Sequence, residues 1–171
     1  MATSRTRVLA AIVLGLLVTA TAHAADLSLT KVRLRRNSSG QGDNSGARVQ
    51  GFFVAAPPGD VFDATNGVTV RIQDAIGTDQ TVVFADVDCL PKGSKTTCLA
   101  GGYKYVQLQV KPSAKVPEAF QFALKVRKLG LAGPFDGPVA VTLTETGSGV
   151  DRVGTITDCV LKVTGIACRA F

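Results

Sequence analysis

The chain has 171 residues, a formal net charge of +6 and 46% hydrophobic residues, which is ordinary for a globular protein. Its one histidine, His23, lies in a segment that we expect to be removed, so the remaining chain lacks the commonest general base and metal ligand. It contains no Gly-x-Ser-x-Gly, phosphate-loop or dinucleotide-binding pattern, and enzymes built on paired carboxylates are the class that still has to be considered.

The first residues have the features of a secretory signal peptide. Two arginines precede a 13-residue run in which Thr19 is the only polar residue, and Ala22 and Ala24 offer the small side chains of a cleavage site. No later run is long and apolar enough to span a bilayer. We therefore expect a signal peptide at 1–24, a mature chain of one domain at 25–171 without a transmembrane segment, and a secreted or periplasmic location.

The charge of the mature chain predicts little about partners. After cleavage, 17 basic and 13 acidic residues remain, a formal charge of +4. Such a charge is sufficient for solubility, and it is too small and too dispersed along the sequence to indicate nucleic acid.

Hydrophobic and polar residues alternate through most of the mature chain, which predicts half-buried strands. The strands expected in the first half are 29–35, 47–55, 67–74 and 81–88. The same alternation continues through 106–111 and 120–127, and turn-forming clusters rich in Gly, Pro, Asn and Asp separate the segments. The sequence therefore predicts an all-β protein, an antiparallel β-sandwich or a barrel-like fold.

The cysteines indicate an internal repeat. Cys89 and Cys98 stand nine positions apart, Cys159 and Cys168 do the same, and the second pair follows the first by 70 residues. The strand-like segments before each pair also agree. We expect two pseudo-twofold repeats of about 70 residues that share one core, because a single repeat alone would be only marginally stable. Their approximate limits are 27–100 and 103–171.

Four cysteines in an exported protein favour two disulfides, and three connectivities are formally possible. Equivalent segments should behave alike, which favours Cys89 with Cys98 and Cys159 with Cys168. Both bonds would then be local clamps on hairpins, and no thiolate would remain for catalysis or for zinc.

The order of segments also resembles a loose group of secreted bacterial duplicated all-β proteins. The likeness rests on a basic alternating strand, a Phe-rich strand, a Gly-x-Thr strand with an Asp-ended turn, and a closing cysteine pair around Lys92, Gly93, Ser94 and Lys95. It extends over nearly the whole mature chain. The resemblance implies a fold, and it carries over no functional residues.

Two groups of carboxylates deserve a test as sites. Asp86 and Asp88 would lie on one face of the strand expected at 81–88, where paired carboxylates can serve glycoside hydrolysis or bind calcium. Asp86 aligns with Ile156 in the other repeat, so the pair is not repeated and a solvated turn is the simpler interpretation. The second group consists of Asp60, Asp63 and Asn66, whose spacing does not match that of a calcium-binding loop. We expect the protein to bind neither a metal nor a cofactor.

Two stripes on predicted strands are candidate binding surfaces. The aromatic and amide stripe consists of Tyr103, Tyr105, Gln107 and Gln109. The basic stripe consists of Lys31, Arg33 and Arg35. The first is suited to sugars or peptides, but it is also an ordinary decoration of an exposed strand. The second is suited to anionic polymers, but charges along a strand also prevent edge pairing, and the sequence favours the structural interpretation of both.

The sequence alone therefore predicts an exported, non-enzymatic binding or structural module whose ligand is unknown. Its partner would be an envelope or extracellular polymer or protein, and no nucleic acid. Two alternatives stay open, a carboxylate-based polysaccharide hydrolase using Asp86 and Asp88, and an inhibitor or adhesin that presents the polar loop at 37–46.

Overall fold

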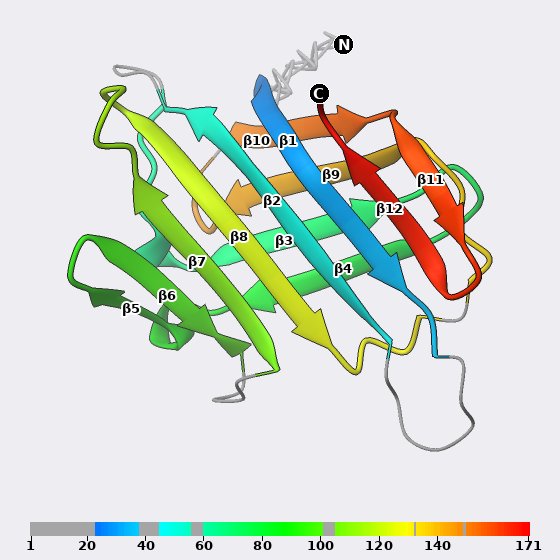
Figure 1. Cartoon of the computed structure of the whole chain (residues 1–171). Coiled ribbons are helices and arrows are strands. Elements are labelled where there is room, and N and C mark those ends of the chain that lie inside the picture. The colour runs from blue at the N-terminus through cyan, green and yellow to red at the C-terminus, as the bar shows by residue number, and fades with distance from the viewer. Residues whose placement is uncertain (1–22, 38–44, 56–59, 101–104, 132, 149) are drawn as a thin grey trace, which may run out of the picture.

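The computed structural model of the chain describes residues 23–37, 45–55, 60–100, 105–131, 133–148 and 150–171 (Figure 1). These residues form twelve strands and two short 3-10 turns, and the described part contains no α-helix. The predicted all-β fold is confirmed. Among the described residues, no helix is long and apolar enough to cross a membrane.

Eight strands form a large front sheet, nearest the viewer in Figure 1. In order across the sheet they are β11 (Cys159–Lys162), β12 (Gly165–Arg169), β1 (His23–Arg35), β2 (Gly46–Val54), β8 (Ala119–Arg127), β7 (Val106–Pro112), β6 (Lys95–Leu99) and β5 (Cys89–Lys92). All neighbours in this sheet are antiparallel. The central pair, β2 and β8, joins the two halves of the chain.

Four strands form a smaller back sheet that crosses behind the front one (Figure 1). In order they are β10 (Val150–Ile156), β9 (Val139–Glu145), β3 (Val68–Gln73) and β4 (Asp79–Phe84). The two 3-10 turns are η1 (Ala64–Asn66), before β3, and η2 (Asp86–Asp88), after β4.

Strand β1 belongs to both sheets. Its first residues pair with β10 in parallel, and its later residues pair with β2 and β12 after an irregularity in register between Leu29 and Lys31. The two sheets therefore form one continuous, nearly closed barrel-like sheet that remains open between β4 and β5. The pairing of β1 begins at His23, two residues before the cleaved chain would begin, and the signal peptide boundary stays a prediction because residues 1–22 lie outside the described part.

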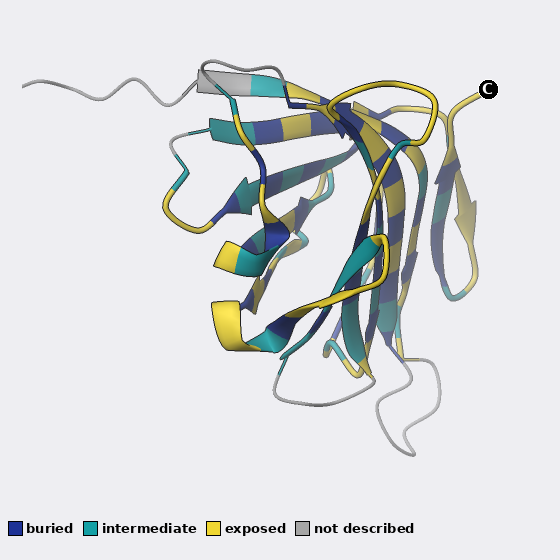
Figure 2. Ribbon diagram, turned by 90° about the vertical axis from the view of Figure 1, so that its left-hand side faces the viewer, coloured by how far each residue is buried: buried dark blue, intermediate teal, exposed yellow. Residues whose placement is uncertain are grey.

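The core lies between the two layers, where buried residues face one another (Figure 2). Alternate residues of the strands point inward, as the period-two pattern predicts. The largest apolar side chains that are fully buried are Phe53, Phe84, Leu34, Ile72, Leu108, Leu124, Leu143 and Ile166. Both halves of the chain supply them, so the prediction of one shared core is consistent with the packing.

Two strand boundaries differ by four residues or more from the sequence-based expectation. The first strand begins at His23 rather than at 29. The strand expected at 81–88 ends at Phe84, because Asp86 and Asp88 are part of the 3-10 turn η2. The expectation that these two aspartates share one strand face is therefore wrong.

Both predicted disulfides are present. Cys89 and Cys98 lie opposite each other in the β5–β6 hairpin, and Cys159 and Cys168 lie opposite each other in the β11–β12 hairpin, with Cα–Cα distances of 3.9 and 4.0 Å. Disulfides persist in oxidising compartments and are rare in the cytosol. The two bonds therefore indicate an oxidising, non-cytoplasmic environment.

The strand order is symmetric in both sheets. If β7–β12 are taken as counterparts of β1–β6, the orders β5-β6-β7-β8-β2-β1-β12-β11 and β4-β3-β9-β10 are unchanged when read from the other edge. The parallel pairing of β1 with β10 has no counterpart between β7 and β4 in the described chain. The internal repeat stays a prediction, because strand order alone does not establish a common origin.

Candidate functional site

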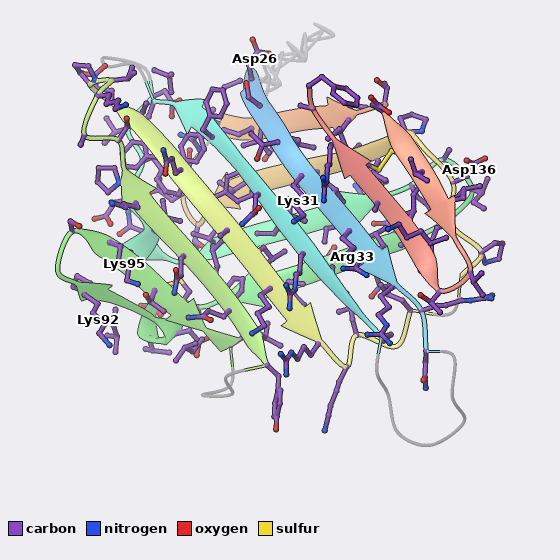
Figure 3. All side chains as sticks on the ribbon, in the orientation of Figure 1. Asp26, Lys31, Arg33, Lys92, Lys95 and Asp136 are labelled. Carbon is purple, nitrogen blue, oxygen red and sulfur yellow. A yellow bond between two sulfur atoms is a disulfide. The ribbon has the colours of Figure 1, made fainter. Side chains whose placement is uncertain are left out.

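The two candidate stripes lie on one face of the molecule. The basic stripe is on β1 and the amide stripe on β7, and β2 and β8 lie between them in the front sheet. Because alternate residues of each strand turn away from the core, both stripes point to the outer face of this sheet, onto which Figure 3 looks. The basic stripe and the amide stripe therefore belong to one surface in the folded protein.

Strand β1 is not an edge strand. It pairs with β2 on one side and with β12 on the other, so Lys31, Arg33 and Arg35 protect no free edge. The edge-protection interpretation of the basic stripe is wrong, because the chain returns at its end to add β12 and β11 beyond β1.

Cations from three neighbouring strands stand abreast on this face. Arg33 on β1 lies directly opposite Arg48 on β2, and Arg48 lies directly opposite Lys125 on β8. Like charges directly opposite each other on one face of a sheet destabilise it. The row is therefore an arrangement that packing and strand pairing alone do not favour.

Three adjoining hollows run along this face, with volumes of about 380, 250 and 770 Å³. The first and second share Arg48, and the second and third share Gln50, Gln109 and Ala123. We call this series of hollows the basic groove. Ten lysines and arginines of the described chain line it: Lys31, Arg33, Arg35, Arg48, Lys92, Lys95, Lys111, Lys125, Arg127 and Lys128.

Small residues on the floor account for the hollows. Gly46 lies between Arg35 and Arg127 across the sheet, and Ala123 lies between Gln50 and Gln109. Long side chains on either side therefore form walls above a floor that lacks them. Gly46 is also fixed by packing, since a Cβ atom there would lie 2.4 Å from the carbonyl oxygen of Val126.

The β5–β6 hairpin closes one end of the groove. Its tip, Lys92 to Lys95, lines the largest hollow together with Thr30 and Phe52 of the sheet. Figure 3 shows Lys92 and Lys95 on this hairpin, while Lys31 and Arg33 lie near the middle of the face. The Cys89–Cys98 disulfide cross-links the base of the same hairpin, so it fixes an element that contributes cations to the groove.

Acidic residues are absent from the groove. Among the described residues, no aspartate or glutamate lines any of the three hollows. The two ion pairs of the described chain, Arg71–Asp79 and Arg152–Asp60, both involve arginines of the back sheet. The basic residues are dispersed along the sequence but concentrated on this face of the folded protein. The sequence-based description of the charge as dispersed therefore does not hold in three dimensions.

Aromatic side chains lie at the two ends of the groove. Tyr105, 45% exposed, lines the first hollow, and the Lys128 ammonium lies 5.1 Å from its ring centroid. Phe52, also 45% exposed, lines the largest hollow at the other end. Tyr103, predicted as part of the same stripe, lies outside the described residues.

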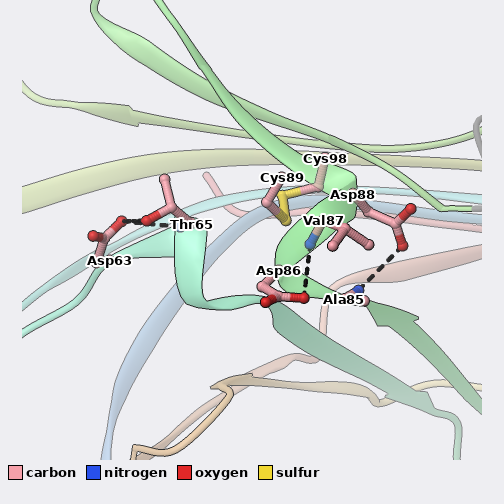
Figure 4. Close-up of a disulfide and its surroundings, with 8 residues drawn as sticks. All are labelled: Asp63, Thr65, Ala85, Asp86, Val87, Asp88, Cys89 and Cys98. Atoms are coloured by element: carbon pink, nitrogen blue, oxygen red, sulfur yellow. Dashed lines mark hydrogen bonds between the residues drawn. A yellow bond between two sulfur atoms is a disulfide. The ribbon is translucent and has the colours of Figure 1, made fainter.

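The carboxylates of Asp86 and Asp88 are engaged by the backbone of their own turn (Figure 4). Asp86 Oδ1 accepts a hydrogen bond from the Val87 amide at 2.8 Å, and Asp88 Oδ2 accepts one from the Ala85 amide at 3.1 Å. Neither residue lines the basic groove. This arrangement lends no support to paired-carboxylate chemistry at Asp86 and Asp88.

The second acidic group is also occupied by protein contacts. Asp60 pairs with Arg152, Asp63 accepts hydrogen bonds from the amide and hydroxyl of Thr65, and Asn66 donates to Glu145 at 2.7 Å. In the part of the chain that the structure describes, no three His, Cys, Asp or Glu side chains gather as a metal site. Asp60 and Asn66 therefore connect the segment before β3 to the back sheet, and Asp63 caps η1 within that segment.

Most of the groove cannot be predicted from the sequence. Arg48, Lys125 and Arg127 follow the same alternation as the two stripes, yet nothing in their spacing shows that β2 and β8 are neighbours. The pairing of these strands connects segments about 70 residues apart. Only a three-dimensional arrangement brings their cations next to Arg33.

Comparisons with known protein families, with curated proteins and with solved structures found no match. The resemblance to secreted duplicated all-β proteins accordingly stays a prediction. The candidate site rests on the geometry of this chain alone.

Proposed function

We propose that the protein is an exported, non-enzymatic binding module that holds an anionic polymer in the basic groove. The observation that carries the proposal is the row of Arg33, Arg48 and Lys125, three cations abreast on neighbouring strands without a carboxylate among the residues that line the groove. A bound polyanion would neutralise this row. Without one, the cations repel each other.

The extent of the groove favours a polymer over a small anion. The groove follows β2 from Gly46 to Phe52, a length of about 20 Å at the rise of a β-strand. Cations lie along this whole length and on the hairpin at its end. A field of one sign over an extended surface also speeds the association of an oppositely charged ligand.

Export agrees with this function. The disulfides indicate an oxidising environment, and the N-terminal sequence predicts a signal peptide. We place the protein in the periplasm or outside the cell, where anionic polymers of the envelope or its surroundings are accessible.

Binding of polyanions to the purified, disulfide-bonded protein tests the proposal. We expect affinity to fall steeply between about 50 and 200 mM salt, because binding releases counterions from the polymer. The variant Arg48→Gln/Lys125→Gln should bind about 10- to 100-fold more weakly, since each lost contact is a charge-assisted hydrogen bond.

The matched control is Arg71→Gln/Lys115→Gln. It removes the same charge from the chain, but Arg71 lies on the back sheet and Lys115 lies in the turn between β7 and β8. Its affinity should equal that of the wild type. Absence of binding to every polyanion at low salt, or an equal loss in both double variants, would refute the proposal.

A further inference from the structure

Amide side chains alternate with cations along the basic groove. In one row across the sheet, Gln107 on β7 lies opposite Lys125 on β8. In the next row, Gln50 and Gln109 lie on either side of Ala123, and in a third, Gln121 lies opposite Lys111. Each of these rows therefore contains both an amide and a positive charge. In the row of Gln50 and Gln109, the charge is that of Lys31 on β1.

These amides have free hydrogen-bonding capacity. No protein group in the described chain forms a hydrogen bond with the side chains of Gln50, Gln107, Gln109 or Gln121. A glutamine amide both donates and accepts. A ligand that carries hydroxyl groups and ring or linkage oxygens matches this capacity, because each such group can donate, accept or both.

The repeat along the groove fits an extended chain. Residues on the same face of a strand recur about every 7 Å, so the rows of Arg35, Arg33 and Lys31 on β1 present charge at that interval. The floor between the rows is open at Gly46 and Ala123. An unbranched polymer can lie along β2 and β8 with its anionic groups toward the walls.

We infer that the ligand of the groove is a linear anionic polysaccharide, a chain of hydroxylated sugars that bear carboxylate or similar groups at short intervals. This inference rests on the proposed function, and it names the class of polymer. The cations neutralise the acidic groups, the glutamine amides bind hydroxyl groups, and Tyr105 and Phe52 offer faces at the ends on which a sugar ring can stack.

Other polyanions would contact fewer of the side chains that line the groove. Proteins that bind single-stranded nucleic acid stack successive bases on aromatic side chains, and the exposed aromatic side chains among the described residues of the groove lie at its two ends. A membrane surface is broad and contacts the side chains that protrude most, so it would leave the recessed floor at Gly46 and Ala123 unused.

The test compares anionic ligands of different chemistry with one uncharged polysaccharide. The probes are polygalacturonate, polyglutamate, single-stranded poly-dT, vesicles of anionic phosphatidylglycerol, and neutral dextran. Dissociation constants are measured with the wild-type protein at one low salt concentration. We expect polygalacturonate to bind about ten-fold more tightly than polyglutamate, which has the carboxylates without the hydroxyls.

Amide variants test the role of the glutamines. Gln107→Met/Gln109→Met keeps the length of both side chains and removes their hydrogen bonds. Its affinity for polygalacturonate should fall about ten-fold more than its affinity for polyglutamate. The control Gln73→Met/Gln80→Met changes two amides of the back sheet, on β3 and β4, and should bind like the wild type.

The outcomes separate this inference from the proposed function. Equal affinity for all polyanions, with no selective effect of the amide variant, overturns the polysaccharide and leaves polyanion binding in place. Tighter binding of poly-dT or of vesicles overturns it in favour of nucleic acid or a membrane. No binding of any anionic probe overturns both.

Discussion

Arg152 and Asp60, 92 residues apart in the chain, form a buried ion pair between β10 and the segment that precedes β3. Arg152 is 0% exposed, and its guanidinium carbon lies 4.8 and 4.7 Å from the ring centroids of Phe53 and Phe62. Burial lowers the pKa of Arg152, although the charges of Asp60 and Glu145 raise it. Nε and Nη1 of this arginine have no hydrogen-bond partner in the described chain.

Replacing this arginine should destabilise the protein. Arg152→Leu leaves Asp60 without its cation in a mostly buried place, and we expect a loss of about 3 kcal/mol in the free energy of unfolding. In the double variant Arg152→Leu/Asp60→Leu neither charge remains, so most of this loss should be recovered. Urea denaturation of the four proteins in the cycle measures the coupling. Equal stability of the single and double variants would contradict a direct interaction.

Removing each disulfide in turn distinguishes its contribution to stability from its contribution to polyanion binding. Each closes a loop of ten residues, so replacing either cysteine pair with alanines should lower the free energy of unfolding by about 2.5 to 3 kcal/mol. Loss of Cys89–Cys98 should also weaken polyanion binding, because the β5–β6 hairpin carries Lys92 and Lys95. Loss of Cys159–Cys168 should leave binding unchanged at a temperature where both variants are folded. An identical effect of the two on binding would exclude the hairpin from the site.

Arg48→Gln should stabilise the protein while it weakens binding. Arg48 lies between Arg33 and Lys125, and removing the central charge relieves two repulsions, which we expect to add about 0.2 to 1 kcal/mol to the free energy of unfolding. Thermal melting at low salt detects the gain, and high salt should abolish it by screening. Lys115→Gln, in the turn before β8, is the control and should not change the melting temperature. A lower melting temperature for Arg48→Gln at low salt would mean that the row is not repulsive.

Asp74 should make stability depend on pH in the acid range. Burial raises the pKa of this carboxyl, but hydrogen bonds from Thr78, Ile76 and Gly77 lower it below the ordinary value of 3.8. A carboxyl with a lower pKa in the folded state stabilises the protein above its unfolded pKa, and this effect is lost as the pH falls through the folded pKa.

We therefore expect Asp74→Asn to cost about 1 kcal/mol at pH 7, and its difference from the wild type to shrink below about pH 4. Urea denaturation at several pH values measures this. Asp158→Asn serves as the control, since the side chain of Asp158 forms no hydrogen bond within the described chain. A difference for Asp74→Asn that persists unchanged at pH 2 would show that the charge is not involved.

Local patterns in the sequence predict much of the fold. The alternation around Val68, Val70 and Ile72 places these residues in the core because the period of a strand is a local property. The pairing of Cys89 with Cys98 follows from nine-residue spacing and its recurrence. Both features depend on residues that are close together in the chain.

The site depends on contacts that no local pattern contains. Gln107 and Arg33 belong to stripes more than 70 residues apart, and they share a face only because β2 pairs with β8. The burial of Arg152 has another cause that the sequence does not show: an arginine in an alternating strand is expected to face solvent, and here the partner Asp60 and two phenylalanine rings keep it inside.

The short strand β5 determines where the sheet stops. Pro91 lies opposite Thr96 in the hairpin and has no amide hydrogen to offer on the open side of β5. Lys92 follows it with a charge at the same border. A second molecule would therefore find fewer backbone partners at this border, which disfavours the addition of its strands past β5.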